Sequence, residues 1–254
     1  MPTSRTDPTL GLPPRDDAAG EYWSFPARTR REVSFGFLLL ALPAIGAFLT
    51  LDVPAARATL LDAWPGEIVS WINHGEVFGD GLGALTILAG VWFLDPRRRR
   101  CLPRLLAATF GAGAAANVVK ACVGRPRPFQ WLADGGLGGT WPAADAWLPL
   151  GTNGTAWQSF PSGHTATAVG LALGLASLYP QGRRYFAALA VLVALQRVMT
   201  DMHFVSDVLA GAATAWLTAA GVFLAPSIHA RFDRFERGER FPAGGSPAPR
   251  RRAA

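Results

Sequence analysis

The sequence is poor in charged residues. Asp, Glu, Lys and Arg together make up 17% of its 254 residues, while half of all residues are hydrophobic. A soluble domain carries about 25% charged residues. The charges here are also clustered, which leaves long stretches without any. This composition argues against a soluble domain and indicates an integral membrane protein made of one domain.

Cysteine is also scarce, with only Cys101 and Cys122 in the chain. They fall at opposite ends of one predicted helix, about 30 Å apart at about 1.5 Å per residue, so they cannot form a disulfide. Two such cysteines cannot build a metal cluster either. The first 33 residues lack the apolar core of a cleaved signal peptide. We therefore expect the first apolar segment to be retained as a spanning helix.

Six apolar segments are long enough, or nearly so, to cross a membrane. They are Ser34–Leu51, Val77–Leu94, Leu102–Val119, Ser162–Tyr179, Tyr185–Met199 and Phe204–Ala225. The expected fold is all-α, a polytopic bundle of six transmembrane helices with a periplasmic loop subdomain. The domain spans residues 34–225, between a disordered cytoplasmic tail at 1–33 and a disordered basic cytoplasmic tail at 226–254. The third segment contains Gly111 and Gly113, which favour close helix packing.

The arginines predict the orientation. With six spans, most of them fall on one side of the membrane, which should be the cytoplasm. These are Arg28, Arg30, Arg31, Arg97 to Arg100, Arg104, Arg183, Arg184, Arg231, Arg234, Arg237 and Arg240. The opposite side then holds residues 52–76, which have the pattern of an amphipathic surface helix. It also holds residues 129–160, a Gly-, Pro- and Trp-rich loop that is long enough to be a lid or a wall over a site.

A first candidate for chemistry is the stretch Phe160 to Thr165, where this loop gives way to an apolar run. Pro161 suits the first position of a helix, which would leave the N–H groups of Ser162, Gly163 and His164 as free donors for an anion. His164 adds a group that exchanges a proton near neutral pH. The alternative is a helix start with a chance histidine.

A second candidate is the pair His203 and Asp207, which lie four residues apart and share one helix face. A carboxylate that accepts from one imidazole nitrogen fixes the tautomer and leaves the other nitrogen as a lone pair. Asp207 lies within an apolar segment, where an ionisable group is costly and a function is the default hypothesis. The alternative is a purely structural His–Asp pair.

The predicted topology brings three segments to one membrane face. Lys120 and Arg127 follow the third helix, Ser162 to His164 begin the fourth, and Arg197 and His203 join the fifth to the sixth. Lys120 is the only lysine in the chain; its alternative reading is an interfacial cation that snorkels to the headgroups. Cations around a helix N-terminus make a phosphate pocket, in which two histidines supply a nucleophile and an acid.

These three segments resemble the phosphatidic acid phosphatase type 2 superfamily. Its first motif, Lys, six residues, Arg-Pro, is matched by Lys120 through Arg127-Pro128, and its second, Pro-Ser-Gly-His, by Pro161 through His164. Its third motif, Ser-Arg, five residues, His, three residues, Asp, is matched from Arg197, but Gln196 stands where the family has Ser. We interpret Gln196 as a change in phosphate contacts. The resemblance covers about residues 77–225.

The resemblance implies a role for each matched residue. His203 would be the nucleophile that forms a phosphohistidine, and Asp207 would orient it. His164 would protonate the leaving alcohol and then activate water. The phosphoryl oxygens would be held by Lys120, Arg127, Arg197, Ser162 and the Gly163 N–H. Phosphoryl transfer needs positioning and charge stabilisation above all, so no metal or other cofactor is expected.

A site beside lipid should take a lipid phosphate monoester or diphosphate, with no nucleic-acid partner. Phosphatidic acid, phosphatidylglycerol phosphate, undecaprenyl diphosphate and the lipid A phosphates all fit. The alternatives are a phosphotransferase that uses an acceptor other than water, and a lipid-binding or transport protein with a vestigial site. The expected location is a bacterial inner membrane, with both termini cytoplasmic and the site facing the periplasm.

Overall fold

The computed structural model describes residues 23–27, 29–61, 64–135, 146–147 and 154–238. Its α-helices are α1 Arg30–Thr50, α2 Asp52–Leu61, α3 Gly66–Asn73, α4 Gly81–Leu94, α5 Leu102–Cys122, α6 Pro128–Ala133, α7 Gly163–Leu178, α8 Arg183–Met199, α9 Val205–Leu224 and α10 Pro226–Arg237. Short 3-10 helices are η2 His74–Phe78, η3 Pro96–Cys101, η5 Thr155–Trp157 and η6 Pro180–Gly182, and two short strands are β1 Val123–Gly124 and β2 Ala146–Trp147.

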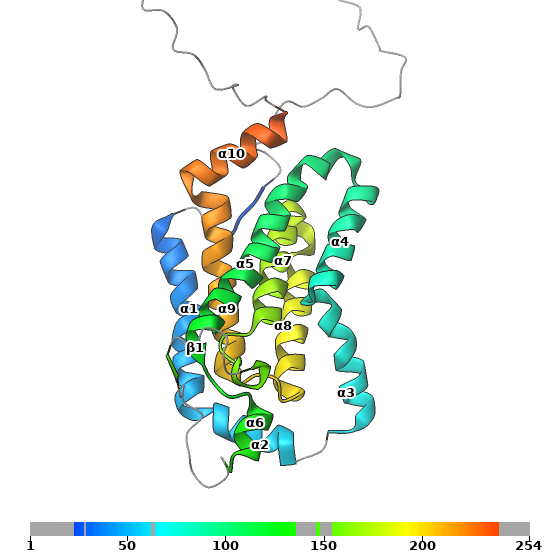
Figure 1. The fold of residues 1–254 in the computed structure, drawn as a ribbon. Helices are drawn as coiled ribbons and strands as arrows, with labels where there is room; N and C mark the ends of the chain where they lie inside the picture. Colours follow the sequence, from blue (N-terminus) through cyan, green and yellow to red (C-terminus); the bar gives the residue numbers. More distant parts are fainter. Residues whose placement is uncertain (1–22, 28, 62–63, 136–145, 148–153, 239–254) are drawn as a thin grey trace, which may run out of the picture.

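Helix α7 forms the centre of the bundle and packs against α5, α8 and α9 (Figure 1). Small residues let these backbones approach each other, as predicted for the third apolar segment. A Cβ at Gly170 would lie 2.5 Å from the carbonyl oxygen of Ala108 on α5, and one at Gly113 would lie 2.6 Å from Thr167 Oγ1 on α7. Helix α1 lies along α9, and α4 packs on the α5 side of the bundle.

Several of the described helices are long and apolar enough to cross a membrane, but by length and composition they are fewer than the six spans expected. Among the described residues, three helical stretches qualify, Arg30–Thr50, Pro96–Cys122 and Val205–Leu224. A fourth results if Gly66–Phe78 and Gly81–Leu94, bent by 60° at their junction, form one broken span. Helix α7 has 16 residues, of which most are buried, and a helix enclosed by protein need not match the full thickness of the hydrocarbon core.

The two expected tails are partly folded, which corrects the prediction of disorder for their described residues. Residues 226–237 form α10, whose Glu236 is buried. Before α1, the indole of Trp23 donates a hydrogen bond of 3.0 Å to Glu236, and Phe25 stacks on Phe223 with ring centroids 4.9 Å apart. The anchor is Arg104 at the start of α5, which is fully buried and contacts Glu236 at 2.8 Å. Buried charges require such partners, and charged composition alone does not reveal them.

The segments expected on the periplasmic side cover the opposite end of the bundle. Residues 52–76 form α2, α3 and the start of η2 instead of one surface helix. Strand β1 pairs antiparallel with β2, Val123 opposite Trp147, and α6 follows at Pro128. Much of the loop at 129–160 lies outside the described residues, so its role as a lid or a wall stays a prediction. Figure 1 places α2 and α6 together beyond the end where α7 begins.

Candidate active site

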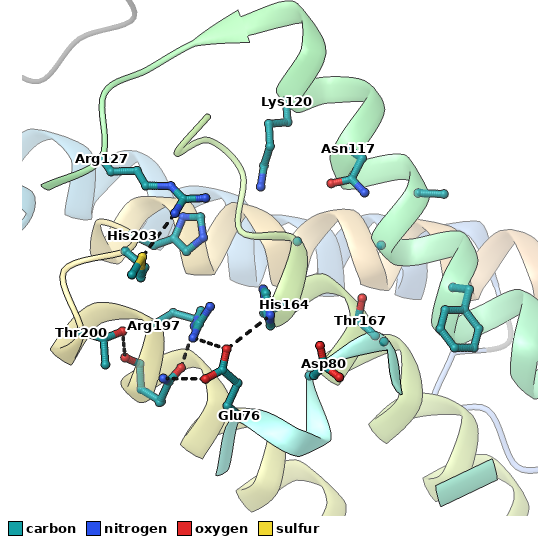
Figure 2. Close-up of a pocket in the computed structure, with 18 of the residues that line it drawn as sticks. Glu76, Asp80, Asn117, Lys120, Arg127, His164, Thr167, Arg197, Thr200 and His203 are labelled. Carbon is teal, nitrogen blue, oxygen red and sulfur yellow. Dashed lines mark hydrogen bonds and ion pairs between the residues drawn. The ribbon is translucent and has the colours of Figure 1, made fainter. Parts of the chain in front are cut away.

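A cavity of about 900 Å³ lies where the three predicted segments meet. Figure 2 shows Lys120 reaching in from α5, His164 at the start of α7, and Arg127 beside His203. Six predicted site residues line the cavity, namely Lys120, Arg127, Gly163, His164, Arg197 and His203. Residues far apart in the sequence are thus brought together at one end of the bundle.

The turn between α8 and α9 places His203 beside Arg197. The N–H groups of Met202 and His203 both donate to the carbonyl oxygen of Arg197, at 3.2 and 3.1 Å. Within this turn Asp201 has a φ of 58°, in the left-handed region that residues other than glycine rarely adopt. The chain folds back on itself here, and the side chains of Arg197 and His203 both reach the cavity.

Asp207 lies behind His203 and is fully buried. Its Oδ2 accepts hydrogen bonds from Ser159 Oγ at 2.5 Å and from the Phe204 N–H at 2.9 Å. The same oxygen is 3.7 Å from His203 Nδ1, an ion-pair distance that is longer than a hydrogen bond. Burial lowers the pKa of His203 despite the nearby carboxylate, which favours a neutral imidazole at neutral pH. With Nδ1 turned toward Asp207, Nε2 is the ring nitrogen left for chemistry.

Asp207 is itself held by a residue that the sequence analysis assigned no role. Arg125 is buried and binds Asp207 Oδ1 through Nη1, while its Nη2 contacts Asp52 Oδ2 at 2.7 Å. Asp52 also accepts from the N–H and the hydroxyl of Ser206, at 2.9 and 2.5 Å. One guanidinium therefore ties α2 to the start of α9. The local signal was a second arginine two residues before Arg127.

Three cations surround the start of α7. Lys120 comes from α5, and its Nζ would lie 3.8 Å from a Cβ at Gly163. Arg127 precedes α6; its Nη1 contacts the sulfur of Met202 at 3.2 Å, and its buried Nε has no hydrogen-bond partner in the part of the chain that the structure describes. Arg197 completes the group from α8. Such convergent donors suit the oxygens of a phosphoryl group.

Comparison with known protein families identifies the family of this chain. The family model of the PAP2 superfamily matches residues 102–230, which include all three motifs. The chain belongs to the PAP2 superfamily.

Two of the proteins to which the chain is similar are lipid A 1-phosphatases. The one from Rhizobium johnstonii is 35% identical over 108 residues, which cover 42% of this chain and 41% of the relative. The one from Rhizobium etli is 35% identical over 102 residues, which cover 40% of each protein. The match thus spans about two fifths of the length of these relatives. No solved structure matches the chain.

Ser162 of the PAP2 second motif does not line the cavity in this structure. It is fully buried, and its hydroxyl accepts from Thr165 Oγ1 at 3.0 Å and from the Thr165 N–H at 3.4 Å, as the N-cap of α7. Its own N–H donates to the carbonyl oxygen of Asp207 at 3.0 Å. The expectation that this N–H is a free donor is therefore wrong, because the chain of α9 already satisfies it.

Gln196, which departs from the PAP2 third motif, is buried and contacts Arg197. Its Oε1 accepts from Arg197 Nε at 2.6 Å, and its Nε2 donates to Asn73 Oδ1 at 3.1 Å and Glu76 Oε2 at 3.3 Å. A serine would be too short to bridge these groups. Gln196 thus contacts the guanidinium of Arg197 directly, and its effect on phosphate contacts stays a prediction.

Glu76 is the second residue that the sequence analysis missed at the PAP2 site. It belongs to η2, outside the three motifs, and lines the same cavity as His164 and Arg197. No local pattern marks it, because its partners are more than 80 residues away along the chain. Among the described residues, no group of three His, Cys, Asp or Glu side chains is arranged to hold a metal ion.

Proposed function

We propose that this PAP2 protein is an integral membrane lipid phosphatase that works through a phosphohistidine on His203. The observation that carries the proposal is the single cavity in which two histidines face three cations from separate segments of the chain. Phosphoryl transfer is catalysed chiefly by positioning and by stabilising charge on the equatorial oxygens. Lys120, Arg127 and Arg197 supply that charge, and the Gly163 N–H at the start of α7 adds a donor.

In the first step, Nε2 of His203 attacks phosphorus and forms a P–N bond as the P–O bond to the lipid alcohol breaks. His164 gives a proton to the leaving oxygen, so the alcohol departs neutral. Asp207 stabilises the positive charge that develops on His203, as a carboxylate does in other nucleophilic dyads and triads. The distance of 3.7 Å between Asp207 Oδ2 and His203 Nδ1 would shorten to a hydrogen bond when substrate binds.

In the second step, water attacks the phosphohistidine from the side that the alcohol left. His164, now neutral, removes a proton from this water, and the P–N bond breaks. Inorganic phosphate and neutral His203 are released, which returns both histidines to their starting protonation states. Neither step needs an external co-reactant besides water.

The substrate we propose is a lipid that carries a phosphate on a polar headgroup, with the 1-phosphate of lipid A as the first candidate. The two relatives are lipid A 1-phosphatases, and the cavity of about 900 Å³ is far larger than a phosphate group. Beyond the cations, its wall carries hydrogen-bonding side chains such as Asn73, Asn117, Thr167 and Thr200, which suit a hydroxylated headgroup.

We further propose that the cavity faces the periplasm. The arginine-rich η3 lies between α4 and α5, at the end of the bundle where α10 also lies (Figure 1). The cavity lies toward the other end, where α7 and α9 begin. Arginine-rich ends stay in the cytoplasm, which would put the cavity on the opposite side.

The test is release of inorganic phosphate from a panel of lipid phosphates in detergent micelles, with and without a chelator. We expect the wild type to release phosphate from lipid A 1-phosphate at the same rate in EDTA, and His203→Ala to release none while it elutes as a folded protein. Full activity of His203→Ala would refute the phosphohistidine, and strict dependence on magnesium would refute the metal-free mechanism. A phosphorylated acceptor lipid in place of free phosphate would indicate a phosphotransferase.

A further inference from the structure

Glu76 places a negative charge inside a cavity built for an anion. Its Oε1 lies 2.6 Å from Arg197 Nη2 and 3.6 Å from His164 Nε2. Figure 2 shows the carboxylate between these two side chains. A carboxylate repels a phosphate, so its presence beside the phosphate-binding arginine calls for a chemical reason.

The contact to His164 supplies that reason. One carboxylate oxygen faces Nε2, which leaves Nδ1 as the ring nitrogen that is free to meet the leaving group. A carboxylate at one imidazole nitrogen keeps a proton there and stabilises the imidazolium. His164 would then carry a second proton on Nδ1, which is the one it must donate.

We propose that Glu76 is a positioning residue that holds a proton on His164 Nε2 and aims Nδ1 at the leaving oxygen, and that it stabilises the imidazolium together with the negative charge of the bound phosphate; this rests on the proposed function. During the first step the Nδ1 proton moves to the alcohol oxygen, while the Nε2 proton stays toward Glu76. The neutral tautomer that results has its lone pair on Nδ1, ready to accept a proton from water. Glu76 and His164 thus form a second carboxylate–imidazole pair, opposite Asp207 and His203.

The other charges around His164 show why a nearby carboxylate matters. Burial disfavours a positive imidazole most, and Arg197 from α8 and His203 from the turn before α9 act in the same direction. The carboxylates of Glu76 and Asp80 favour it. Lys120 from α5 reaches the start of the same helix. Asp80 is committed as the N-cap of α4, where its Oδ2 accepts from two backbone N–H groups at 2.9 and 3.1 Å. Glu76 is therefore the carboxylate available to His164.

Glu76 is also held in place, as a positioning residue must be. Gln196 Nε2 donates to its Oε2 at 3.3 Å and to Asn73 Oδ1 at 3.1 Å, while Gln196 Oε1 accepts from Arg197 Nε at 2.6 Å. Arg197 donates a hydrogen bond to Oε1 of Glu76 and Gln196 donates one to Oε2, so both carboxylate oxygens have a partner. This accounts for a long amide at position 196, where the family motif has a short hydroxyl.

The experiment compares two substrates that differ in their need for an acid. Lipid A 1-phosphate has a poor leaving group that needs a proton, whereas 4-nitrophenyl phosphate has a good one that does not. We expect Glu76→Gln to lower the ratio of kcat/KM for the lipid to kcat/KM for the aryl phosphate by about 10- to 100-fold, within the range of general acid catalysis. The ratio cancels any loss of phosphate binding through Arg197, because both substrates carry the same phosphoryl group.

Three further variants make the outcome decisive. Glu67→Gln, at an exposed glutamate of α3 that does not line the cavity, should leave the ratio within about 3-fold of the wild type. Glu76→Asp should restore part of the ratio that Glu76→Gln loses. His164→Ala should lower the ratio at least as far as Glu76→Gln does. In Glu76→Gln the alkaline limb of the pH profile for the lipid substrate should also move to lower pH, since the imidazolium loses its counter-charge.

Each result supports or overturns the inference. An unchanged ratio in Glu76→Gln with a lowered ratio in His164→Ala overturns the role of Glu76 alone. An unchanged ratio in both variants overturns His164 as the acid and the role of Glu76 with it. If the wild-type protein releases phosphate from neither substrate, the proposed function itself fails.

Discussion

Replacement of Arg125 by methionine tests whether the position of the Asp207 carboxylate depends on a buried ion-pair network. The guanidinium lies over the rings of Phe204 and Phe48, whose centroids are 4.4 and 5.2 Å from its Cζ. It binds Asp52 and Asp207, both of which are fully buried. Methionine keeps a long apolar side chain near these rings but leaves two buried carboxylates without this cation.

Breaking a buried ion pair by removing one partner costs about 3–5 kcal/mol. We expect Arg125→Met to lower the free energy of unfolding by at least that amount, because two carboxylates lose one shared guanidinium. Arg125→Lys should lose less, since it keeps the charge but not the fork that reaches both carboxylates. Adding Asp52→Asn to Arg125→Met should recover part of the loss, because one uncompensated charge is removed.

The assay is denaturant unfolding in detergent followed by tryptophan fluorescence, together with kcat/KM for phosphate release. Activity should fall by about 10- to 100-fold below the wild type, because Asp207 loses the group that fixes its position behind His203; loss of a correct carboxylate–imidazole arrangement can cost about 10⁴. Arg184→Met, on the exposed face of α8, is the control and should stay within about 0.5 kcal/mol. If Arg125→Met unfolds like this control and keeps its activity, the network does not hold the site.

Three further predictions follow from other parts of the molecule. Arg104→Met should lower the free energy of unfolding by about 3–5 kcal/mol and leave phosphate release intact, because Arg104 binds Asp233 and Glu236 of α10 far from the cavity; equal loss of activity would contradict this. Gly170→Leu should destabilise by about 1–3 kcal/mol or more in the same unfolding assay, since its Cβ would lie 2.5 Å from the carbonyl oxygen of Ala108. Because burial lowers the pKa of His203, kcat/KM should stay high as the pH falls past the ordinary histidine value of about 6.5. The acid limb should then lie below that value, and a limb above pH 7 would show that His203 is not the buried neutral nucleophile.

The sequence alone identified the residues whose spacing is local. His203 and Asp207 are four residues apart, and the Lys120–Arg127 spacing and the Pro161–His164 run are each contained in one short segment. Hydropathy then fixed which ends of the helices those segments occupy, so their meeting at one cavity was predictable. The number of spans was not, because α7 is enclosed by its neighbours and α4 is bent away from α3.

Only the tertiary structure revealed the residues that act through distant partners. Asp52 meets Ser206 across 154 positions, and Glu76 meets Arg197 across 121; no periodicity or motif encodes such pairs. The same holds for α10, which charge composition predicted to be a loose tail and which Arg104 binds through a buried contact at 2.8 Å to Glu236. The residue types of the candidate site and their local spacing can be read from the sequence. The partners that orient them cannot, because they come within hydrogen-bond distance only when distant segments pack together.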